Sequence, residues 1–212
     1  MMIVNEIFYS IQGESTRAGL PCTFVRLTGC DLRCVYCDTT YAFRAGRAMG
    51  LEQVVAEVER IGCRFVTVTG GEPLLQDESF VLIEHLGKMG YDVQVETSGS
   101  VDISRLEGRA RVILDIKTPG SGMLDRMDWD NLQRLRKGDE VKFVLMGRPD
   151  YEWSRRILRE SALPSDVAVL LSPAHDVLDP RDLAQWMKED RIAARLHLQL
   201  HKYVWGADKR GV

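Results

Sequence analysis

Seven short, largely apolar segments recur along the chain, and polar or glycine-rich stretches separate them. We predict strands at residues 23–28, 65–69, 92–97, 111–116, 140–145, 167–171 and 195–200. Between several of them, apolar residues repeat at helical spacing, in residues 51–61, 78–89 and 180–189. Gly62 and Gly90 follow the first two helices, while Asp179 and Pro180 suit the N-cap and first position of the third. Strands that alternate with helices predict a parallel sheet with right-handed crossovers.

The number of these units limits the architecture. The 212 residues are too few for eight full strand–helix units, which need roughly 250 residues. We therefore predict an α/β fold, a compact and incomplete parallel (β/α) barrel of about six strands. Residues 98–110 are too short or too polar for a convincing helix. No repeat, low-complexity tract or linker divides the chain, so residues 1–212 are expected to form a single domain.

Many of the predicted strands keep a polar residue on one face near the C-terminal end. These residues are Arg26, Gln94, Glu96, Asp115, Lys117, Lys142, His197, Gln199 and His201. In a parallel barrel such faces converge on one lumen, with the ligand at the C-terminal mouth. The alternative is a half-exposed sheet whose polar faces meet solvent. Arg, Glu and Lys at the same end of four strands favour the shared cavity.

Composition and charge exclude several classes of function. Hydrophobic residues make up 45% and charged residues 28% of the chain, as in ordinary globular proteins. A net charge of -3 argues against a protein built mainly to bind nucleic acid. No apolar run approaches the roughly 20 residues that span a membrane, and the N-terminus lacks signal-peptide features. We therefore expect a cytoplasmic location, without nucleic-acid or membrane partners.

The five cysteines are odd in number and clustered, which indicates metal or redox chemistry rather than disulfides. Cys30, Cys34 and Cys37 form a C-x-x-x-C-x-x-C pattern, whereas Cys22 and Cys63 are expected to be small buried hydrophobes. A closed zinc site needs four ligands, and His175 or His201 could supply the fourth. Alternatively, three thiolates can hold three irons of a 4Fe–4S cluster and leave the fourth iron open for a substrate or cofactor.

The segment "TGGEP", Thr69 to Pro73, directly follows a predicted strand. Its glycines permit close backbone approach and unusual dihedral angles. Together with the cysteine pattern, in which the aromatic Tyr36 precedes the last cysteine, it resembles the paired signatures of the radical S-adenosylmethionine (SAM) enzymes. The alternatives are a structural metal site and a non-enzymatic iron–sulfur electron carrier, which would have no use for a SAM site.

The N-terminal stretch "VNEIFYSIQGES" points to one family within that superfamily. With "TFVRLTGCDLRCVYCDT", "TGGEPLLQ", "VETSGS", "DIKTPGSG", "VKFVL", "LSPAH" and "LQLHKYVWG", it closely resembles the 7-carboxy-7-deazaguanine synthases of queuosine and deazapurine biosynthesis. The resemblance implies a radical SAM domain over residues 1–212. It also implies that a reduced cluster cleaves SAM to a 5′-deoxyadenosyl radical, which removes a hydrogen from 6-carboxy-5,6,7,8-tetrahydropterin. The ring contracts, ammonia leaves and SAM is regenerated.

The resemblance further implies magnesium as a cofactor, an electron donor such as flavodoxin or ferredoxin, and a homodimer. It assigns the 4Fe–4S cluster to Cys30, Cys34 and Cys37, and magnesium to Thr39. The implied substrate-binding residues are Ile11, Gln12, Gly13, Glu14, Arg26, Thr69 and His201. The implied SAM-binding residues are Tyr36, Cys37, Asp38, Gly70, Gly71, Glu72, Glu96, Ser98, Asp115, Ile116, Lys117, Ser172, Pro173, Ala174 and His175.

Some of these assignments also have a chemical rationale. The amide of Gln12 can donate to and accept from a pterin edge, Glu14 can pair with its guanidine-like part, and Arg26 can hold a carboxylate with two hydrogen bonds. Lys142 could form a buried ion pair or contact a ligand, and the sequence leaves both roles open. The sequence assigns no role to the segment after His201. The competing enzyme function is a radical SAM activase that installs a glycyl radical on a partner protein.

Overall fold

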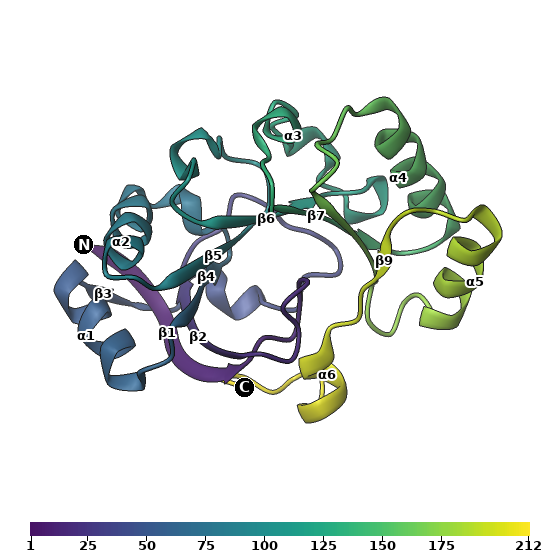
Figure 1. The fold of residues 1–212 in the computed structure, drawn as a ribbon. Helices are drawn as coiled ribbons and strands as arrows, with labels where there is room; N and C mark the ends of the chain where they lie inside the picture. Colours follow the sequence, from purple (N-terminus) through teal and green to yellow (C-terminus); the bar gives the residue numbers. More distant parts are fainter.

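One curved sheet of nine strands forms the centre of the computed structural model, which describes residues 1–212 (Figure 1). The strands are β1 (Met2–Ile11), β2 (Pro21–Leu27), β3 (Arg47–Met49), β4 (Phe65–Gly70), β5 (Asp92–Thr97), β6 (Arg111–Ile116), β7 (Glu140–Leu145), β8 (Ala168–Pro173) and β9 (Arg195–Leu196). Their order is β3-β1-β2-β4-β5-β6-β7-β8-β9. β1 is antiparallel to β2 and β3, and all pairs from β2 to β9 are parallel. The edge strands β3 and β9 do not pair with each other, which confirms an incomplete parallel barrel.

Helices cover the outer side of this sheet (Figure 1). They are α1 (Leu51–Ile61), α2 (Asp77–Lys88), α3 (Asn131–Arg134), α4 (Arg148–Glu160) and α5 (Pro180–Asp190), while α6 (Leu200–Trp205) lies on the inner side. Short 3₁₀ turns occupy Thr40–Phe43, Pro73–Leu75, Ser104–Leu106, Pro119–Ser121 and Leu124–Arg126. The connection over residues 98–110 therefore contains one 3₁₀ turn and no α-helix, as predicted. None of the helices is both long enough and apolar enough to cross a membrane.

The helix boundaries follow from local sequence. In α1, the buried Val54, Val55 and Val58 face the core, and Gly62 ends the helix with φ +78°. In α5, the carboxylate of Asp179 accepts a hydrogen bond from the backbone N–H of Arg181, with Pro180 at the first helical position. The predicted N-cap is thus confirmed.

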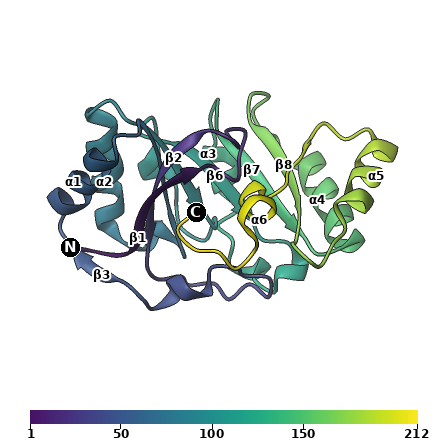
Figure 2. The same cartoon turned by 90° about the horizontal axis from the view of Figure 1, so that it is seen from below.

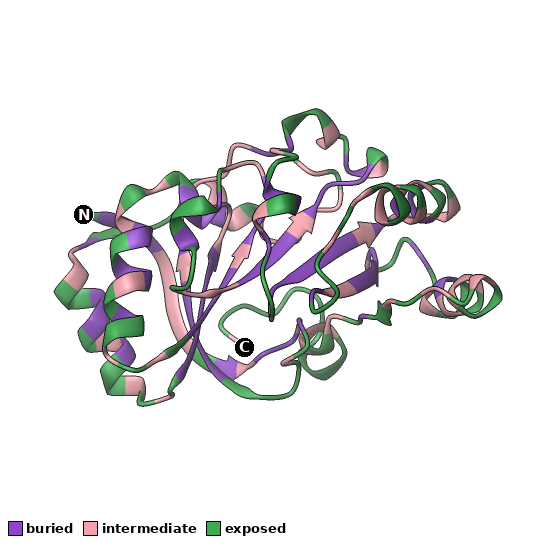
Figure 3. Ribbon diagram, turned by 45° about the horizontal axis from the view of Figure 1, so that its top comes forward, coloured by how far each residue is buried: buried purple, intermediate pink, exposed green.

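The two faces of the sheet differ in polarity. Apolar strand residues such as Val68, Val95 and Leu114 are fully buried with the inner faces of the helices, in a core of 33 residues (Figure 3). The neighbouring positions Thr69, Glu96 and Asp115 project to the opposite, concave face, because successive side chains along a strand alternate between faces. The polar residues are therefore not spread over a solvent-facing sheet, and the prediction of a shared lumen is confirmed.

The predicted strand at residues 195–200 is wrong beyond Leu196. Only Arg195 and Leu196 pair with β8, and Leu200 already begins α6. The polar alternation in this segment has a different cause: side chains from it reach the turn that follows β1. His197 accepts a hydrogen bond from Ser15, and the backbone N–H of Leu200 donates to the carbonyl of Gly13. Strands β1 and β3 and helix α4 lie outside the predicted elements.

Candidate active site

A cavity of about 650 Å³ opens on the concave face of the sheet. Five strands point one polar side chain each into it: Arg26 from β2, Thr69 from β4, Glu96 from β5, Asp115 from β6 and Lys142 from β7. Figure 2 shows α6 and the C-terminal segment crossing in front of this face. Ligand sites of parallel barrels lie at the C-terminal ends of the strands, and this cavity follows that rule.

Three cysteines line one end of the cavity, on the loop that follows β2. Cys30, Cys34 and Cys37 are free thiols, half-buried, and the backbone N–H of Cys37 donates to the carbonyl of Cys34 at 3.1 Å. Burial raises the pKa of Cys34 to about 11 and raises the pKa values of Cys30 and Cys37 as well. The thiolate forms therefore need a strongly cationic group beside them, as an iron cluster provides.

The geometry gives no support to a closed zinc site. No three His, Cys, Asp or Glu side chains are placed so that they could hold a single metal ion. His175 also lines the cavity, but its Nδ1 atom lies 3.1 Å from Asp176. A four-iron cluster spreads its ligands over several irons, so its cysteines need not converge on one point.

The two glycines of "TGGEP" pack directly against the chain that leads to the cysteine loop. A Cβ atom on Gly70 would overlap the carbonyl oxygen of Leu27, and one on Gly71 would overlap Gly29 and Cys30. The backbone N–H of Glu72 completes this contact by donating to the carbonyl of Gly29 at 2.8 Å. These glycines thus allow a close backbone approach within the protein, and its partner is the segment that carries the first cysteine.

Glu72 itself does not line the cavity. It is fully buried and accepts hydrogen bonds from Thr97 Oγ1 at 2.9 Å, from the backbone N–H of Ser98 at 2.6 Å and from that of Leu74 at 2.9 Å. Burial raises its pKa. These contacts tie two loops at the mouth of the barrel together, so the structure gives Glu72 a supporting position behind the site.

The turn after β1 also lines the cavity, through Gln12, Gly13 and Glu14. Gln12 is buried, and its amide nitrogen donates to Thr67 Oγ1 at 3.0 Å and to Glu96 at 3.3 Å. Next along the turn, the backbone N–H of Ser15 donates to His197 Nε2 at 2.8 Å, with Ser15 at φ 69°. The backbone N–H of Thr16 donates to the carboxylate of Glu140 at 3.0 Å. The turn is thereby anchored across the open side of the barrel.

A row of alternating charges runs along the floor of the cavity. Lys142 Nζ lies 2.6 Å from Glu14 Oε2 and 3.0 Å from Asp115 Oδ2, and Lys117 Nζ lies 3.0 Å from Asp115 Oδ1. Burial alone would raise the pKa of Glu14, but Lys142 holds it well below the usual value. Lys142 is therefore part of a buried ion pair, one of the two roles left open above.

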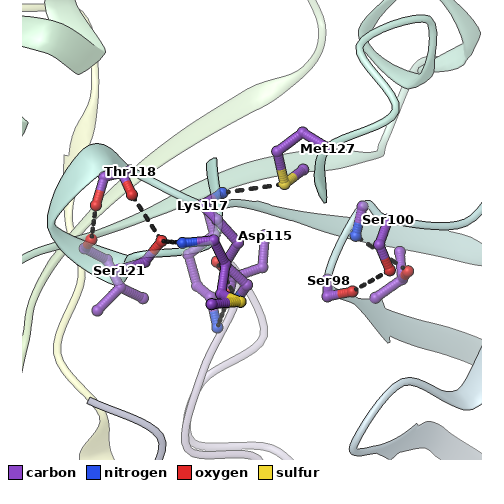
Figure 4. Close-up of polar contacts among 12 residues, drawn as sticks. Ser98, Ser100, Asp115, Lys117, Thr118, Ser121 and Met127 are labelled. Atoms are coloured by element: carbon purple, nitrogen blue, oxygen red, sulfur yellow. Dashed lines mark hydrogen bonds and ion pairs between the residues drawn. The ribbon is translucent and has the colours of Figure 1, made fainter. Parts of the chain in front are cut away.

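The loop after β6 shapes the Lys117 end of this row. Figure 4 shows Lys117 and Asp115 between two fixed loop segments. On one side the hydroxyl of Ser121 donates to the carbonyl of Thr118 at 2.6 Å, and on the other Met127 Sδ lies 3.5 Å from the backbone nitrogen of Lys117. Ser98 and Ser100, whose hydroxyls are 3.0 Å apart, stand on the neighbouring loop.

Glu96 and Arg26 also line the cavity. Burial and the nearby Glu14 raise the pKa of Glu96, whose Oε2 accepts from Thr69 Oγ1 at 3.0 Å. Arg26 uses its Nε to donate to Glu6 at 2.8 Å. The guanidinium group of Arg26 lines the cavity, where a carboxylate can accept hydrogen bonds from its remaining N–H groups.

Thr39 lies where the cysteine loop meets α6. Its hydroxyl donates to Asp38 Oδ1 at 2.8 Å, and Lys202 Nζ lies 2.5 Å from Asp38 Oδ2. Because the proton of Thr39 points to Asp38, the oxygen lone pairs are free for a hard cation. A hydroxyl oxygen is a ligand that a hard cation accepts, so Thr39 could supply one ligand of a magnesium ion.

The structure brings most of the predicted site residues together. All the assigned residues line the cavity except Glu72, Ile116, Ser172 and Pro173, which are buried behind its wall. The lining also contains residues that the sequence did not assign: Phe8, Tyr41, Phe43, Gln199, Lys202 and the C-terminal residues Ala207–Val212. Gln199 had a visible signal, since it alternates with His197 and His201. The C-terminal residues had none.

This combination of barrel, cysteine loop and glycine loop agrees with the comparisons with known proteins. Residues 24–158 match the Radical SAM superfamily, and the chain belongs to this superfamily, whose members use a 4Fe–4S cluster and SAM. It is 41% identical to the 7-carboxy-7-deazaguanine synthase of Koribacter versatilis (strain Ellin345), with all of both chains covered. It is 42% identical to that of Chlorobaculum tepidum, with 99% of this chain and 96% of the relative covered. The chain belongs to the 7-carboxy-7-deazaguanine synthase family.

A solved structure supports the same placement. The chain superimposes on QueE from Escherichia coli with a TM-score of 0.79 and 27% identity, over 94% of each chain. The resemblance seen in the sequence is therefore confirmed, and none of these relatives favours the activase.

Proposed function

We propose that the protein converts 6-carboxy-5,6,7,8-tetrahydropterin into 7-carboxy-7-deazaguanine and ammonia, with SAM regenerated in each turnover. The observation that carries this proposal is that one cavity is lined both by the three cysteines and by Gln12 and Arg26. A glycyl-radical activase would need an open face for a polypeptide. Here the turn after β1 and the C-terminal segment wall the cavity in, as a small substrate requires.

The cysteine end is assigned to the cofactors. Cys30, Cys34 and Cys37 would hold the 4Fe–4S cluster, and the cluster and SAM together supply the radical chemistry when bound. The hydroxyl of Tyr36 is buried without a hydrogen-bond partner, which supports a ligand atom beside it. The Oδ1 atom of Asp115 also lacks a hydrogen bond of good geometry. We assign both Tyr36 and Asp115 to SAM. The protein's part is to fix these groups and to exclude water.

The opposite end is assigned to the substrate. Glu14, ionised beside Lys142, accepts hydrogen bonds from the guanidine-like edge of the pterin, and Arg26 donates to its carboxylate. Glu96, which accepts hydrogen bonds from Gln12 and Thr69 beside this end, stays assigned to SAM. Thr39 offers its oxygen to a magnesium ion, which can also hold the substrate carboxylate. His201 packs on Gly13 and closes this end.

The test is an anaerobic turnover assay on the iron-reconstituted protein with reductant, SAM, magnesium and 6-carboxytetrahydropterin. Mass detection of 7-carboxy-7-deazaguanine without net loss of SAM is the expected result. SAM cleavage without any deazapurine would contradict the substrate assignment and would return the activase as the next hypothesis. If the addition of SAM leaves the spectrum of the cluster unchanged, the assignment of the cluster and SAM to this cavity is contradicted.

We further propose that residues 1–212 act as one radical SAM domain in the cytoplasm, where reducing conditions keep the five cysteines free. A homodimer is supported by exposed apolar side chains on β9, on α6 and between them: Leu196, Leu198, Leu200, Tyr203, Val204 and Trp205. Light scattering on the purified protein tests it, and a monomer across micromolar concentrations would contradict it. A flavodoxin or ferredoxin is proposed as the electron donor.

A further inference from the structure

Lys142 is a buried cation in β7 that contacts carboxylates from two distant parts of the chain. Its side chain is 10% exposed, and its Nζ atom lies 2.6 Å from Glu14 and 3.0 Å from Asp115. Asp115 is its direct neighbour in the register of β6 and β7, whereas Glu14 belongs to the turn after β1. One ammonium group therefore joins the wall assigned to the substrate with the floor assigned to the cofactor.

The charges in this row balance only when Lys142 is present. Glu14, Lys142, Asp115 and Lys117 alternate in sign, and all four side chains are at most 16% exposed. Removing the central lysine would leave two buried carboxylates facing a single cation. A buried charge that has lost its partner is strongly unfavourable, so the row would rearrange or take up a proton.

We propose that Lys142 is a positioning residue that holds Glu14 for the substrate and Asp115 for the cofactor at the same time. This inference rests on the function proposed above. Two of the three N–H donors of the ammonium group are taken by these carboxylates, so Lys142 acts through them. Gln199 supports the same arrangement, because its amide nitrogen donates to Glu14 Oε1 at 2.7 Å and leaves that carboxylate little freedom.

The role of Lys142 has a signature in pH dependence. Glu14 must be ionised to accept hydrogen bonds from a guanidine-like edge. The groups that face Glu14 are Lys142, His197, His201, Gln199 and, with opposite sign, Glu96. Loss of an adjacent cation raises the pKa of a carboxyl group by about 1–3 units. Binding of the substrate should weaken as pH falls and Glu14 takes up a proton, which gives the pH profile an acid limb. This limb should therefore move upward by about 1–3 pH units when Lys142 is replaced by a neutral residue.

The experiment measures anaerobic binding of 6-carboxytetrahydropterin by calorimetry, with SAM present and no reductant, between about pH 5 and pH 8. We expect Lys142→Met to bind the pterin at least about tenfold more weakly than wild type at the acid end of this range. The acid limb of its binding profile should lie at higher pH than that of wild type. Lys142→Arg, which keeps the charge, should retain the wild-type limb. The matched control is Lys137→Met, because Lys137 precedes the same strand but is 87% exposed; it should bind as wild type does.

A double variant separates positioning from folding. Glu14→Gln with Lys142→Met removes both charges of the pair, which proteins tolerate better than the loss of one partner. If Lys142 acts through Glu14, the double variant binds the pterin as Glu14→Gln does and shows no acid limb, even where Lys142→Met alone fails to fold. Additive losses, or a wild-type limb in Lys142→Met, would overturn the inference while leaving the proposed function intact. Wild-type protein that binds no pterin would overturn the proposed function and this inference with it.

Discussion

Replacing Gly71 by alanine tests whether the "TGGEP" loop positions the cysteine loop through direct backbone contact. The new Cβ atom would lie within overlap of the Gly29 carbonyl oxygen and 2.7 Å from Cys30 Cβ. Ordinary contacts begin at 3.4 Å, so the chain around Gly29 must retreat by about 1 Å. Neither neighbour is the end of a flexible side chain, and the retreat therefore displaces the residue assigned as the first cluster ligand.

The size of the effect follows from this displacement. Overpacking of a close contact costs about 1–3 kcal/mol, and each kcal/mol lowers the melting temperature of a chain of this length by about 2–4 °C. A misplacement of about 1 Å in a catalytic arrangement costs about a hundredfold in rate. We therefore expect Gly71→Ala to lose iron after reconstitution and to cleave SAM about a hundredfold more slowly, with a fall in melting temperature of several degrees.

Iron content, the visible spectrum of the cluster and 5′-deoxyadenosine formation are measured on the same anaerobic sample. The matched control is Gly87→Ala in α2, where the nearest atom to a new Cβ is 3.5 Å away and alanine is the better helix former. It should keep the iron content and the rate of SAM cleavage of the wild type. If Gly71→Ala also keeps both, the close contact does not position the cluster loop and the argument fails.

Three further outcomes are expected. Burial lowers the pKa of His197, so its contribution to stability is complete above about pH 6.5 and falls as pH drops through the folded-state pKa. His197→Gln keeps an acceptor for Ser15 but does not titrate, so its melting temperature should fall less than that of wild type between about pH 7 and pH 5, and parallel curves would contradict this. If Thr39 ligates the cation proposed above, Thr39→Val should weaken Mn²⁺ binding about tenfold, measured by electron paramagnetic resonance, because the hydroxyl ligand is lost; unchanged affinity would refute this role. Arg26→Met should raise KM for the pterin at least about tenfold, because a charged hydrogen bond is lost, and an unaltered KM would exclude the carboxylate contact.

Much of the central sheet was predictable from sequence, for a physical reason. The strands at 92–97, 111–116 and 140–145 have the predicted bounds. In each, an apolar face that packs against helices alternates with polar residues that face the lumen, so the pattern carries both the strand and its orientation. Glu96 and Asp115 could be assigned to one cavity before any coordinates, because the C-terminal ends of parallel strands lie at the same edge.

The remaining parts depend on contacts between distant segments, which no local pattern encodes. His197 and Gln199 alternate as strand residues do, yet they leave the sheet because Ser15 and Glu14 offer them hydrogen bonds. The approach of residues 207–212 to the cavity likewise depends on packing, with the Arg210 guanidinium 4.0 Å from the ring centre of Tyr41. For Lys142, the sequence shows a lysine on a lumen-facing strand but cannot show which carboxylates meet it.

The two ends of the cavity are therefore held in place by different means. The cysteine end depends on backbone contacts at Gly70 and Gly71, which tolerate almost no change in side-chain volume. The substrate end belongs to a turn and a C-terminal segment that bridge the gap left by the unclosed sheet, held by polar contacts such as Ser15 to His197 and Glu14 to Lys142. Polar contacts respond to pH and to single charge changes, whereas backbone packing does not. It follows that changes of pH should impair pterin binding before they impair SAM cleavage, because ionisable side chains hold the end assigned to the substrate and backbone packing holds the cysteine end.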